Sequence, residues 1–486
     1  MITTTGRTSS AYRGRRVVHR GDILRWGHDR PREVLMKASF RALRAAACAT
    51  AIAACGFPKP ADVPECAKSS DCASAAAPYC VDSTCASACR LNEHCQGLSG
   101  TSFCQTATGK CVGCLDATAC STDKPVCDAT GVCRACSRDD ECASGVCVDA
   151  EGRCAMASEV VFLAQQASDN ATCSAAAPCR SFAAALAAAS PQRNILHIVG
   201  GTYTTAMGIA PAGPRFTIDG SDTIVTVDQG VAFSSAEARQ TITVSRVTIN
   251  AAGGTSVSAT NGGAILLYKV TLGGKAVATG GSLGIQNSSV RDVTCSAAGA
   301  VDIEESTVGR VDAGNCGLTA QRDRFNDEIE ANGGKVIVEN SLIVSQNEVQ
   351  DGVLIPSSLT GSRFAFNTLV NFSGVDGTST ALSCNAGLDV SSNIFAWHSS
   401  SSMVIEGCVP HHSLFDTFAP TALVGANHQG DALTFFVDLN GRDVHLSAAS
   451  PALRIGEANV VDVDIDGAAR PDPAGSSPDA GAYERP

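Results

Sequence analysis

The chain has 486 residues, of which 46 are Gly, 24 are Cys and only 5 % are aromatic, and its formal net charge is −12 at pH 7. A chain of this length exceeds the size at which one hydrophobic core stops growing, so we expect more than one structural unit. No apolar run approaches the roughly 20 residues that a membrane-spanning helix requires. The negative charge argues against nucleic acid and anionic lipid as partners, because binding to phosphates is dominated by Lys and Arg.

The segment that begins at Met36 has the anatomy of a secretory signal peptide. A basic start, with Lys37, Arg41 and Arg44, precedes a short apolar run over residues 45–54. We therefore expect residues 36–54 to direct export. Residues 1–35 are rich in Arg but lead into no apolar run, so we expect translation to start at Met36, with a long unstructured leader as the alternative.

The end of this segment, Ile52-Ala53-Ala54-Cys55, resembles the lipobox of bacterial lipoproteins. The resemblance implies that Cys55 is the lipidation site and the mature N-terminus. Because Gly56 and not Asp follows it, the resemblance favours a lipid-anchored protein in the outer membrane or on the cell surface of a bacterium. Removal of residues 1–54, which carry 11 basic and 3 acidic residues, changes the net charge from −12 to −20.

Residues 55–65 are interpreted as a tether, and a fourfold cysteine repeat follows over residues 66–154. In each unit the first two cysteines are separated by five residues. Apolar residues are too sparse here for an independent core, so we expect covalent cross-links to stabilise the units. The four units contain Cys66, Cys72, Cys80 and Cys85; Cys89, Cys95, Cys104 and Cys111; Cys114, Cys120, Cys127 and Cys133; and Cys136, Cys142, Cys147 and Cys154.

These sixteen cysteines predict eight disulfides in an oxidising compartment, with a connectivity that the sequence does not define. Zinc binding is the alternative, because residues 111–114 and 133–136 are CxxC pairs. Both pairs straddle repeat boundaries and the chain carries an export signal, which favours disulfides. The spacing resembles the dickkopf-type cysteine-rich repeats of secreted bacterial proteins, and this resemblance implies a stalk or binding module.

From Ser158 the composition changes to Val, Ile, Thr, Ser, Asn and Gly, and residues 158–442 are expected to form the main domain. Its first part is interpreted as a strand, a loop that a disulfide between Cys173 and Cys179 can close, a helix over roughly residues 181–189, and a second strand. This order, followed by Gly201-Thr202-Tyr203, resembles the N-terminal cap of right-handed parallel β-helix proteins of the pectate-lyase-like type.

An apolar-x-x-x-x-apolar unit then recurs at intervals of 17 to 26 residues. The units end at Ile249, Leu272, Val290, Val308, Phe325, Ile343, Leu369 and Phe395. Such a recurrence of β-branched strands and Gly-rich turns is typical of a β-solenoid, in which each coil buries its face against the next. Leucine-rich repeats have a similar period but need Leu and Asn at fixed places, which these units lack. We therefore predict an all-β fold, a right-handed parallel β-helix with a short N-terminal capping helix, preceded by a small disulfide-rich repeat domain.

The fourth position of these units is polar in the later coils, where it is occupied by Ser288, Ser306, Asp323, Ser341, Asn367 and Asn393. Small polar side chains stacked in this way are expected to satisfy one another's hydrogen bonds at a turn. Cys295 and Cys316 lie about one coil apart, as do Cys384 and Cys408, so we expect each pair to cross-link neighbouring coils.

Many β-helix proteins are polysaccharide lyases or hydrolases, and one cluster contains the residue types that these reactions need. A lyase requires a base and a cation, whereas a hydrolase requires two carboxyl groups on either side of the glycosidic bond. The candidate catalytic residues are Glu304, Glu305, Arg322, Asp323, Arg324 and Glu339, on three successive predicted coils. The alternative for the same residues is a solvated face with ion pairs between coils.

Other features weaken the prediction of catalysis. The paired-Asp and Asn-Thr-Asp constellations of the polygalacturonase-like family are missing, as is the Arg-rich signature of pectate lyases. Trp397 is the only Trp after residue 54, whereas sugar-binding clefts usually present several aromatic side chains. His411 and His412 have no metal-ligand partner at a recognisable spacing, so we expect a surface loop there and no metal site.

The stretch DVDIDG, Asp462–Gly467, has Asp at alternate positions, as in a calcium loop. An EF-type loop that starts at Asp462 needs a bidentate Glu at its twelfth position, where this chain has Pro473. We therefore expect no cofactor, with a weak calcium site as the alternative.

The order of motifs over residues 443–486 instead resembles the closing segment of many bacterial surface β-helix proteins. The resemblance implies that this segment wraps back on the last coils and caps them, which a terminal coil needs because its edge groups are otherwise exposed. An Arg after an Asp-Gly turn is expected to pair with a carboxylate. The matching residues are Asp464, Asp466, Gly467, Arg470, Asp479, Gly481 and Glu484.

Together these features predict a lipid-anchored cell-surface protein whose β-helix has a non-catalytic binding or adhesion role. The expected ligand is a carbohydrate or another surface protein, and the membrane is contacted by the lipid anchor only. The alternative is a polysaccharide lyase or glycoside hydrolase that uses the face carrying Glu304 and Arg322.

Overall fold

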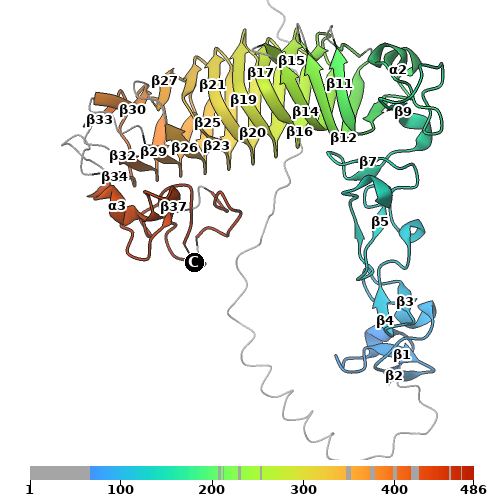
Figure 1. The fold of residues 1–486 in the computed structure, drawn as a ribbon. Coiled ribbons are helices and arrows are strands. Elements are labelled where there is room, and N and C mark those ends of the chain that lie inside the picture. The colour runs from blue at the N-terminus through green and yellow to red at the C-terminus, as the bar shows by residue number, and fades with distance from the viewer. Residues whose placement is uncertain are drawn as a thin grey trace, which may run out of the picture. The chain divides into compact units, whose positions relative to one another are not determined.

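The computed structural model describes residues 66–205, 209–211, 213–227, 231–251, 254–345, 352–372, 378–397, 402–416, 426–458, 461–471 and 473–485. The fold is mostly β: a region with several disulfide pairs precedes a parallel β-solenoid that spans residues 195–415 and has about nine turns (Figure 1). No helix in the described part is long and apolar enough to cross a lipid bilayer. The predictions for the leader over residues 1–54, the tether over residues 55–65 and the lipidation of Cys55 lie outside the described residues.

Each cysteine-rich unit consists of a short 3-10 helix followed by a two-stranded antiparallel hairpin. The helices are η1 (Ser69–Asp71), η2 (Asn92–Cys95), η3 (Ala117–Ala119) and η4 (Asp139–Glu141). The hairpins pair β1 (Tyr79–Val81) with β2 (Thr84–Ala86), β3 (Phe103–Gln105) with β4 (Lys110–Val112), β5 (Val126–Cys127) with β6 (Cys133–Arg134), and β7 (Cys147–Val148) with β8 (Arg153–Cys154).

The predicted disulfides of this region are confirmed, and the structure adds their connectivity. In the second, third and fourth units, the first cysteine bonds to the third and the second bonds to the fourth. The bonds are Cys89–Cys104, Cys95–Cys111, Cys114–Cys127, Cys120–Cys133, Cys136–Cys147 and Cys142–Cys154. In the first unit Cys72, the second cysteine, bonds to Cys85, the fourth.

The N-terminal end of the solenoid is built as the sequence predicts. After η5 (Ala157–Glu159), strand β9 (Val160–Leu163) pairs in parallel with β10, and a disulfide joins Cys173 to Cys179. Helix α2 (Phe182–Ala188) begins after Ser181, whose Oγ accepts a hydrogen bond from the amide of Ala184 at 3.2 Å. The apolar side of α2 packs on the solenoid core, so the short capping helix is confirmed.

The coils of the solenoid form three parallel sheets, here named A, B and C (Figure 1). Sheet A contains β10 (Ile195–Ile198), the first parts of β12 (Arg215–Val227) and β14 (Thr241–Ala251), β16 (Ala264–Tyr268), β18 (Ser282–Gln286), β20 (Ala300–Glu304), β22 (Gly317–Gln321), β25 (Val336–Glu339), β28 (Arg363–Ala365) and β31 (Asp389–Ser391).

Sheet B contains β11 (Gly201–Thr205), the second parts of β12 and β14, the first parts of β17 (Thr271–Thr279), β19 (Ser289–Ser296) and β21 (Thr307–Gly314), then β23 (Arg324–Phe325), β26 (Leu342–Ser345), β29 (Thr368–Asn371), β32 (Ile394–Trp397), β34 (Leu414–Asp416) and β35 (His428–Gly430). Sheet C contains β13 (Phe233–Ser235), β15 (Thr255–Thr260), the second parts of β17, β19 and β21, then β24 (Ile329–Asn332), β27 (Val353–Ser357), β30 (Thr378–Cys384) and β33 (Ser402–Glu406).

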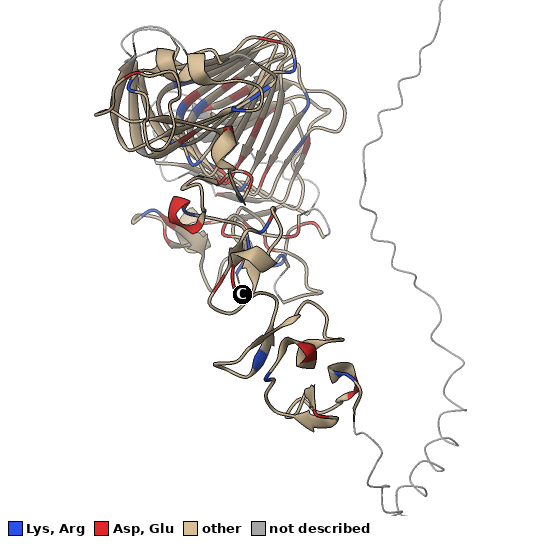
Figure 2. Ribbon diagram, turned by 90° about the vertical axis from the view of Figure 1, so that its right-hand side faces the viewer, with Lys and Arg blue, Asp and Glu red and all other residues tan. Residues whose placement is uncertain are grey.

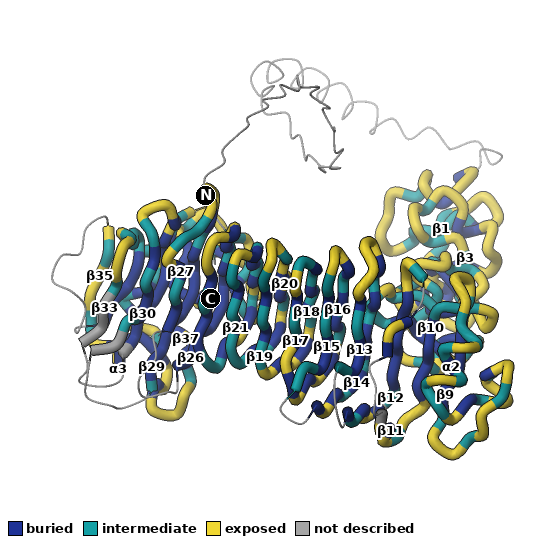
Figure 3. The backbone as a smooth tube through the Cα atoms, turned by 90° about the horizontal axis from the view of Figure 1, so that it is seen from above, coloured by how far each residue is buried: buried dark blue, intermediate teal, exposed yellow. Residues whose placement is uncertain are grey.

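The repeated apolar residues stack in register inside the solenoid. Each of the eight predicted positions, from Ile249 to Phe395, is paired with the next, and each is at most 3 % exposed. Side chains alternate between the two faces of a strand, so the inward residues of the three sheets form one continuous core. Figure 3 shows this core as dark blue strands between yellow turns.

A polar ladder runs along the corner where sheet A turns into sheet B. Ser288, Ser306, Asp323, Ser341, Asn367 and Asn393 each accept a hydrogen bond from a backbone amide of the preceding coil, at 2.8–3.2 Å. The sequence predicted that these side chains bond to one another. Their partners are instead backbone amides at the turn, which must be satisfied because they are buried.

Two further disulfides join neighbouring coils, as predicted. One links Cys295 with Cys316 and the other links Cys384 with Cys408. The first closes a sequence separation of 21 residues and the second a separation of 24 residues, which is about one coil in each case.

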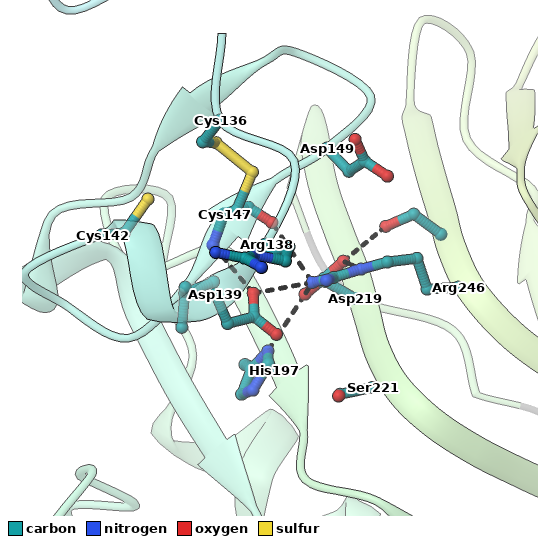
Figure 4. Close-up of polar contacts among 12 residues, drawn as sticks. Cys136, Arg138, Asp139, Cys142, Cys147, Asp149, His197, Asp219, Ser221 and Arg246 are labelled. Atoms are coloured by element: carbon teal, nitrogen blue, oxygen red, sulfur yellow. Dashed lines mark hydrogen bonds and ion pairs between the residues drawn. A yellow bond between two sulfur atoms is a disulfide. The ribbon is translucent and has the colours of Figure 1, made fainter. Parts of the chain in front are cut away.

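The fourth cysteine-rich unit contacts the first coils of the solenoid through a network of charged side chains (Figure 4). Arg246 donates from Nη2 to Asp139 at 2.8 Å and to Asp219 at 2.5 Å. Asp219 is fully buried, and its carboxylate also contacts Nδ1 of His197 at 3.0 Å and Oγ of Ser245 at 2.7 Å. A buried carboxylate costs stability unless such partners surround it, so this network ties the unit to the solenoid.

The C-terminal segment lies along the flank of the last coils. It contains α3 (Ala432–Phe435), β36 (Phe436–Asp438) and β37 (Asp443–Leu446), and it packs on the outward side of sheet B (Figure 1). The outward residues that it covers include Leu342, Val370, Ile394 and Leu414. The covering segment therefore includes α3 and begins before residue 443, where the sequence motif starts.

Candidate functional site

The solenoid register brings the predicted cluster to one corner. Glu304, Gln321 and Glu339 each end a strand of sheet A and are aligned one above another on the outside. The next residues along the chain, Glu305 and Arg322, begin the turn into sheet B with φ angles of +51° and +60°. The left-handed backbone at this turn points their side chains to the same corner on neighbouring coils.

Arg322 is the centre of this cluster. Its Nη2 lies 2.7 Å from the carboxylate of Glu304 and 2.8 Å from that of Glu305. The two carboxylates therefore share one guanidinium nitrogen. Paired carboxylates of a glycosidase instead stand on opposite sides of a bond, about 5 to 9.5 Å apart.

Glu339 is buried and already engaged. Its carboxylate forms an ion pair with Arg363 on the next coil, and its Oε2 accepts a hydrogen bond from Nε2 of Gln321 at 3.1 Å. These partners compensate the burial of the charge. Of the predicted carboxylates, Glu339 is thus a structural link between coils rather than an open group at the surface.

Asp323 points into the solenoid and away from the other candidates. It is fully buried, and its Oδ1 accepts the amide of Ser306 at 2.8 Å as one step of the polar ladder. Burial raises the pKa of this carboxyl well above its usual range. Its Oδ2 has no hydrogen-bond partner among the described residues. Asp323 follows Arg322 directly in the chain, but its side chain points inward whereas that of Arg322 points outward, so the two groups lie on opposite faces.

The remaining outward residues define what we call the corner strip: Gln286, Asn287, Ser289, Glu304, Glu305, Thr307, Gln321, Arg322 and Arg324. All nine side chains are polar and at least partly exposed. The strip has two acidic and two basic side chains, so its formal charges cancel. Figure 2 shows this mixing on a larger scale, with blue and red segments interspersed among the solenoid strands.

The strip ends at a hollow of about 330 Å³ against the C-terminal segment. Glu305, Thr307, Arg322 and Arg324 line one side, and the Asp466-Gly467 turn lines the other. The DVDIDG stretch and the charged cluster are therefore neighbours in space. The sequence did not predict this proximity, because about 140 residues lie between the two features.

The turn of that stretch is held by hydrogen bonds from the backbone. Asp464 Oδ1 accepts the amides of Asp466 and Ala468 at 3.0 and 2.7 Å, and Oδ2 accepts the amide of Glu484 at 3.0 Å. Asp464 is only 2 % exposed, whereas Asp466 points outward and contacts Nε2 of His445 at 3.1 Å. Both oxygens of Asp464 are thus engaged by the backbone, as in an Asx turn, and are not directed at a common ion position.

The other residues of the closing motif meet beneath this turn. The Nε of buried Arg470 lies 3.2 Å from the carboxylate of Glu484, Nη1 donates to the carbonyl of Gly481 at 3.0 Å, and the guanidinium stacks over the ring of Phe366. Burial lowers the pKa of Arg470 to about 10. Asp479 accepts the amides of Arg454 and Arg485 at 2.8 and 2.9 Å, and burial raises its pKa.

A second hollow, of about 480 Å³, lies on sheet A and was not predicted. Small residues at Gly284 and Gly317 leave the space, and Leu266, Asp302 and Lys335 lie around it. Partial burial and then the nearby Glu304 raise the pKa of the Asp302 carboxyl. Gly284 aligns with Leu266 and Asp302 on the coils beside it, and Gly317 aligns with Ala300, so each Gly is the smallest residue in its own column of sheet A.

The fold and this geometry define a disulfide-containing parallel β-solenoid protein with a polar corner strip. No protein-family model matches the chain, and no curated protein matches its sequence.

Proposed function

We propose that this chain is a non-catalytic binding protein whose corner strip takes a neutral, hydroxyl-rich glycan. The observation that carries the proposal is the shared engagement of Arg322 by Glu304 and Glu305, at 2.7 and 2.8 Å. A lyase needs a cation available to the uronate and a base available to the proton. Here the cation is already neutralised, and the buried carboxyls of Asp323 and Glu339 are engaged in the ladder and in an ion pair.

The chemistry of the strip favours a neutral ligand over an acidic one. Carboxylates accept hydrogen bonds from sugar hydroxyls, and Gln286, Gln321 and Arg324 supply donors. Charge-assisted hydrogen bonds of this kind are the strong ones, whereas an anionic polymer meets two carboxylates on the same corner. The coils repeat at the spacing of strands in a sheet, about 4.8 Å. A linear ligand that lies across the coils therefore meets residues of the corner strip at the same positions in each successive coil.

The proposed location at a bacterial cell surface is supported by the segment over residues 36–55. Its basic start, apolar run and terminal Cys55 favour export and lipid anchoring. The disulfides of the described part fit an oxidising compartment.

The test measures binding of the full, oxidised chain to a panel of neutral and uronic-acid polysaccharides. Arg324→Ala removes an exposed donor of the strip, and Lys275→Ala, an exposed cation on sheet C, is the matched control. We expect Arg324→Ala to weaken binding to a neutral glycan about tenfold, the loss of one charge-assisted hydrogen bond, and Lys275→Ala to leave it unchanged.

Two results contradict the proposal. Equal binding by both variants means that the ligand lies elsewhere. New reducing ends or unsaturated uronate products, lost in Glu305→Gln, mean that the corner strip is the active site of a glycoside hydrolase or polysaccharide lyase.

A further inference from the structure

We infer that His411, His412 and Glu457 form a binding site for a divalent transition metal, with Zn²⁺ as the best match. The two histidines precede β34 on the last coils, and Glu457 belongs to the C-terminal segment. One nitrogen from each histidine and one carboxylate oxygen of Glu457 all lie within 4.8 Å of one another. The sequence predicted a surface loop here, because Glu457 is too distant along the chain to suggest a third ligand.

The distances fit a tetrahedral metal. The Nδ1 atoms of His411 and His412 are 3.1 Å apart, and Nδ1 of His411 is 3.9 Å from Oε2 of Glu457. Two nitrogens bound at 2.0–2.1 Å to a tetrahedral zinc stand about 3.3 Å apart. The histidine pair is already close to this separation, and the partly exposed side chain of Glu457 needs to move about 0.6 Å closer to Nδ1 of His411 to match it.

A second group fixes the orientation of His411. Its Nε2 lies 3.0 Å from Oδ1 of Asp389. When Nε2 carries the proton and donates it to this carboxylate, Nδ1 keeps its lone pair for a metal. The same carboxylate-histidine arrangement supports metal ligands in general, because it sets the tautomer and raises the basicity of the ring.

Ser392 forms hydrogen bonds to the backbone of both segments that carry the ligands. The amide of Ser392 donates to the carbonyl of His411 at 3.0 Å, and Oγ of Ser392 accepts the amide of Glu457 at 2.8 Å. Ligand placement therefore does not depend on the side chains alone. A set of two imidazoles and one carboxylate suits Zn²⁺ better than Mg²⁺ or Ca²⁺, which prefer oxygen ligands.

Metal binding at this place joins the last coils to the segment that covers sheet B. A site with three protein ligands leaves a fourth position for water or for a group of a partner molecule. This inference is independent of the glycan proposed for the corner strip, since it uses none of the strip's residues.

The test uses the full, oxidised, untagged chain after removal of metal by chelation. Calorimetric titration with ZnCl₂, melting curves with and without zinc, and the visible spectrum of the Co²⁺ form measure binding, stabilisation and coordination. His412→Asn suits the φ of +50° at this position, where Asn is tolerated, and Glu457→Gln preserves shape. His445→Asn is the matched control, because His445, like His411, contacts two carboxylates through opposite ring nitrogens but is not one of the proposed ligands.

We expect saturable binding of one Zn²⁺ per chain, a higher melting temperature with zinc, and no competition by Mg²⁺. Both ligand variants should lose the zinc-dependent rise in melting temperature while melting like the wild type without zinc, and the control should keep it. Asp389→Asn should weaken the affinity about 10- to 100-fold. The inference is wrong if the wild-type chain binds no Zn²⁺ saturably, or if the two ligand variants bind it as the wild type does; the histidines then share a hydrogen bond only.

Discussion

Replacement of Arg470 by Ala is expected to destabilise the protein strongly, because it removes the cation that neutralises the buried carboxylate of Glu484. The side chains of Arg470 and Glu484 are 0 % and 1 % exposed, and Nε of Arg470 lies 3.2 Å from the Glu484 carboxylate. With a pKa of about 10, Arg470 is charged at neutral pH. Breaking a buried ion pair by removal of one partner costs about 3–5 kcal/mol, and loss of the contact with the Phe366 ring adds to it.

The assay is urea unfolding of the full oxidised chain, followed by circular dichroism at neutral pH. Arg138→Ala is the control: Arg138 and its partner Asp140 are 69 % and 72 % exposed, and such a pair contributes at most about 1 kcal/mol. The double variant Arg470→Met, Glu484→Gln should recover part of the loss, since it removes both charges. A loss for Arg470→Ala below about 1 kcal/mol, or equal to that of the control, would refute the view that this pair holds the closing segment.

Three further predictions concern the ladder and the closing turn. The raised pKa of Asp323 means that the folded state favours the protonated carboxyl, so the stability that this carboxyl contributes is complete below the unfolded pKa near 3.9 and is lost as the pH rises toward the folded pKa. Asp323→Asn should therefore gain stability over the wild type as the pH increases from 4 to 8, and a difference in urea midpoint between variant and wild type that is the same at both pH values would contradict this. Gly481→Ala should melt well below Gly467→Ala, because both have φ near +90° or +80° but an added Cβ at Gly481 lies 2.5 Å from Ile394 and one at Gly467 has nothing within 4 Å; equal melting temperatures would mean that backbone strain alone acts. Calcium or a calcium chelator should leave the melting temperature unchanged, since both oxygens of Asp464 accept backbone amides, and a rise with calcium would restore the calcium-loop interpretation.

The register of the solenoid was predictable from the sequence because the information is local. Each coil repeats an inward apolar residue at the same step of a short strand, and a slip of one residue between such strands turns these residues outward. The pairing of Ile343 with Leu369 and of Leu369 with Phe395 follows from this rule alone. Helix α2 was predictable for the same reason, from an Ala-rich stretch after a capping Ser181.

The sites were less predictable because they combine segments that are distant in the sequence. Spacing indicated that Glu304 and Arg322 meet, since they are one coil apart. It gave no reason to place the turn at Gly467 beside them, or Glu457 beside His411. These contacts depend on where the C-terminal segment docks, which is decided by tertiary packing and not by period. Strand alternation predicts that Asp323 points inward, because Phe325 is an inward core position and Arg324 points outward. This direction excludes Asp323 from the candidate catalytic group.

One sequence signal does locate the docking of the C-terminal segment. Outward positions of sheet B are polar in the middle coils, at Thr271, Ser289, Thr307 and Arg324. In the next four coils the same column holds Leu342, Thr368, Ile394 and Leu414, of which only Thr368 is polar, and its Oγ1 accepts the amide of Ala482 in the C-terminal segment. Apolar side chains on the outside of a solenoid must be covered, so the change at Leu342 marks where the cover begins. The same change explains why the corner strip ends at Arg324, against the Asp466-Gly467 turn. The position of the proposed binding site therefore follows from the composition of one column of the solenoid: the coils from Thr271 to Arg324 are polar there and remain open to a ligand, and the coils from Leu342 to Leu414 are mostly apolar there and are closed by the protein itself.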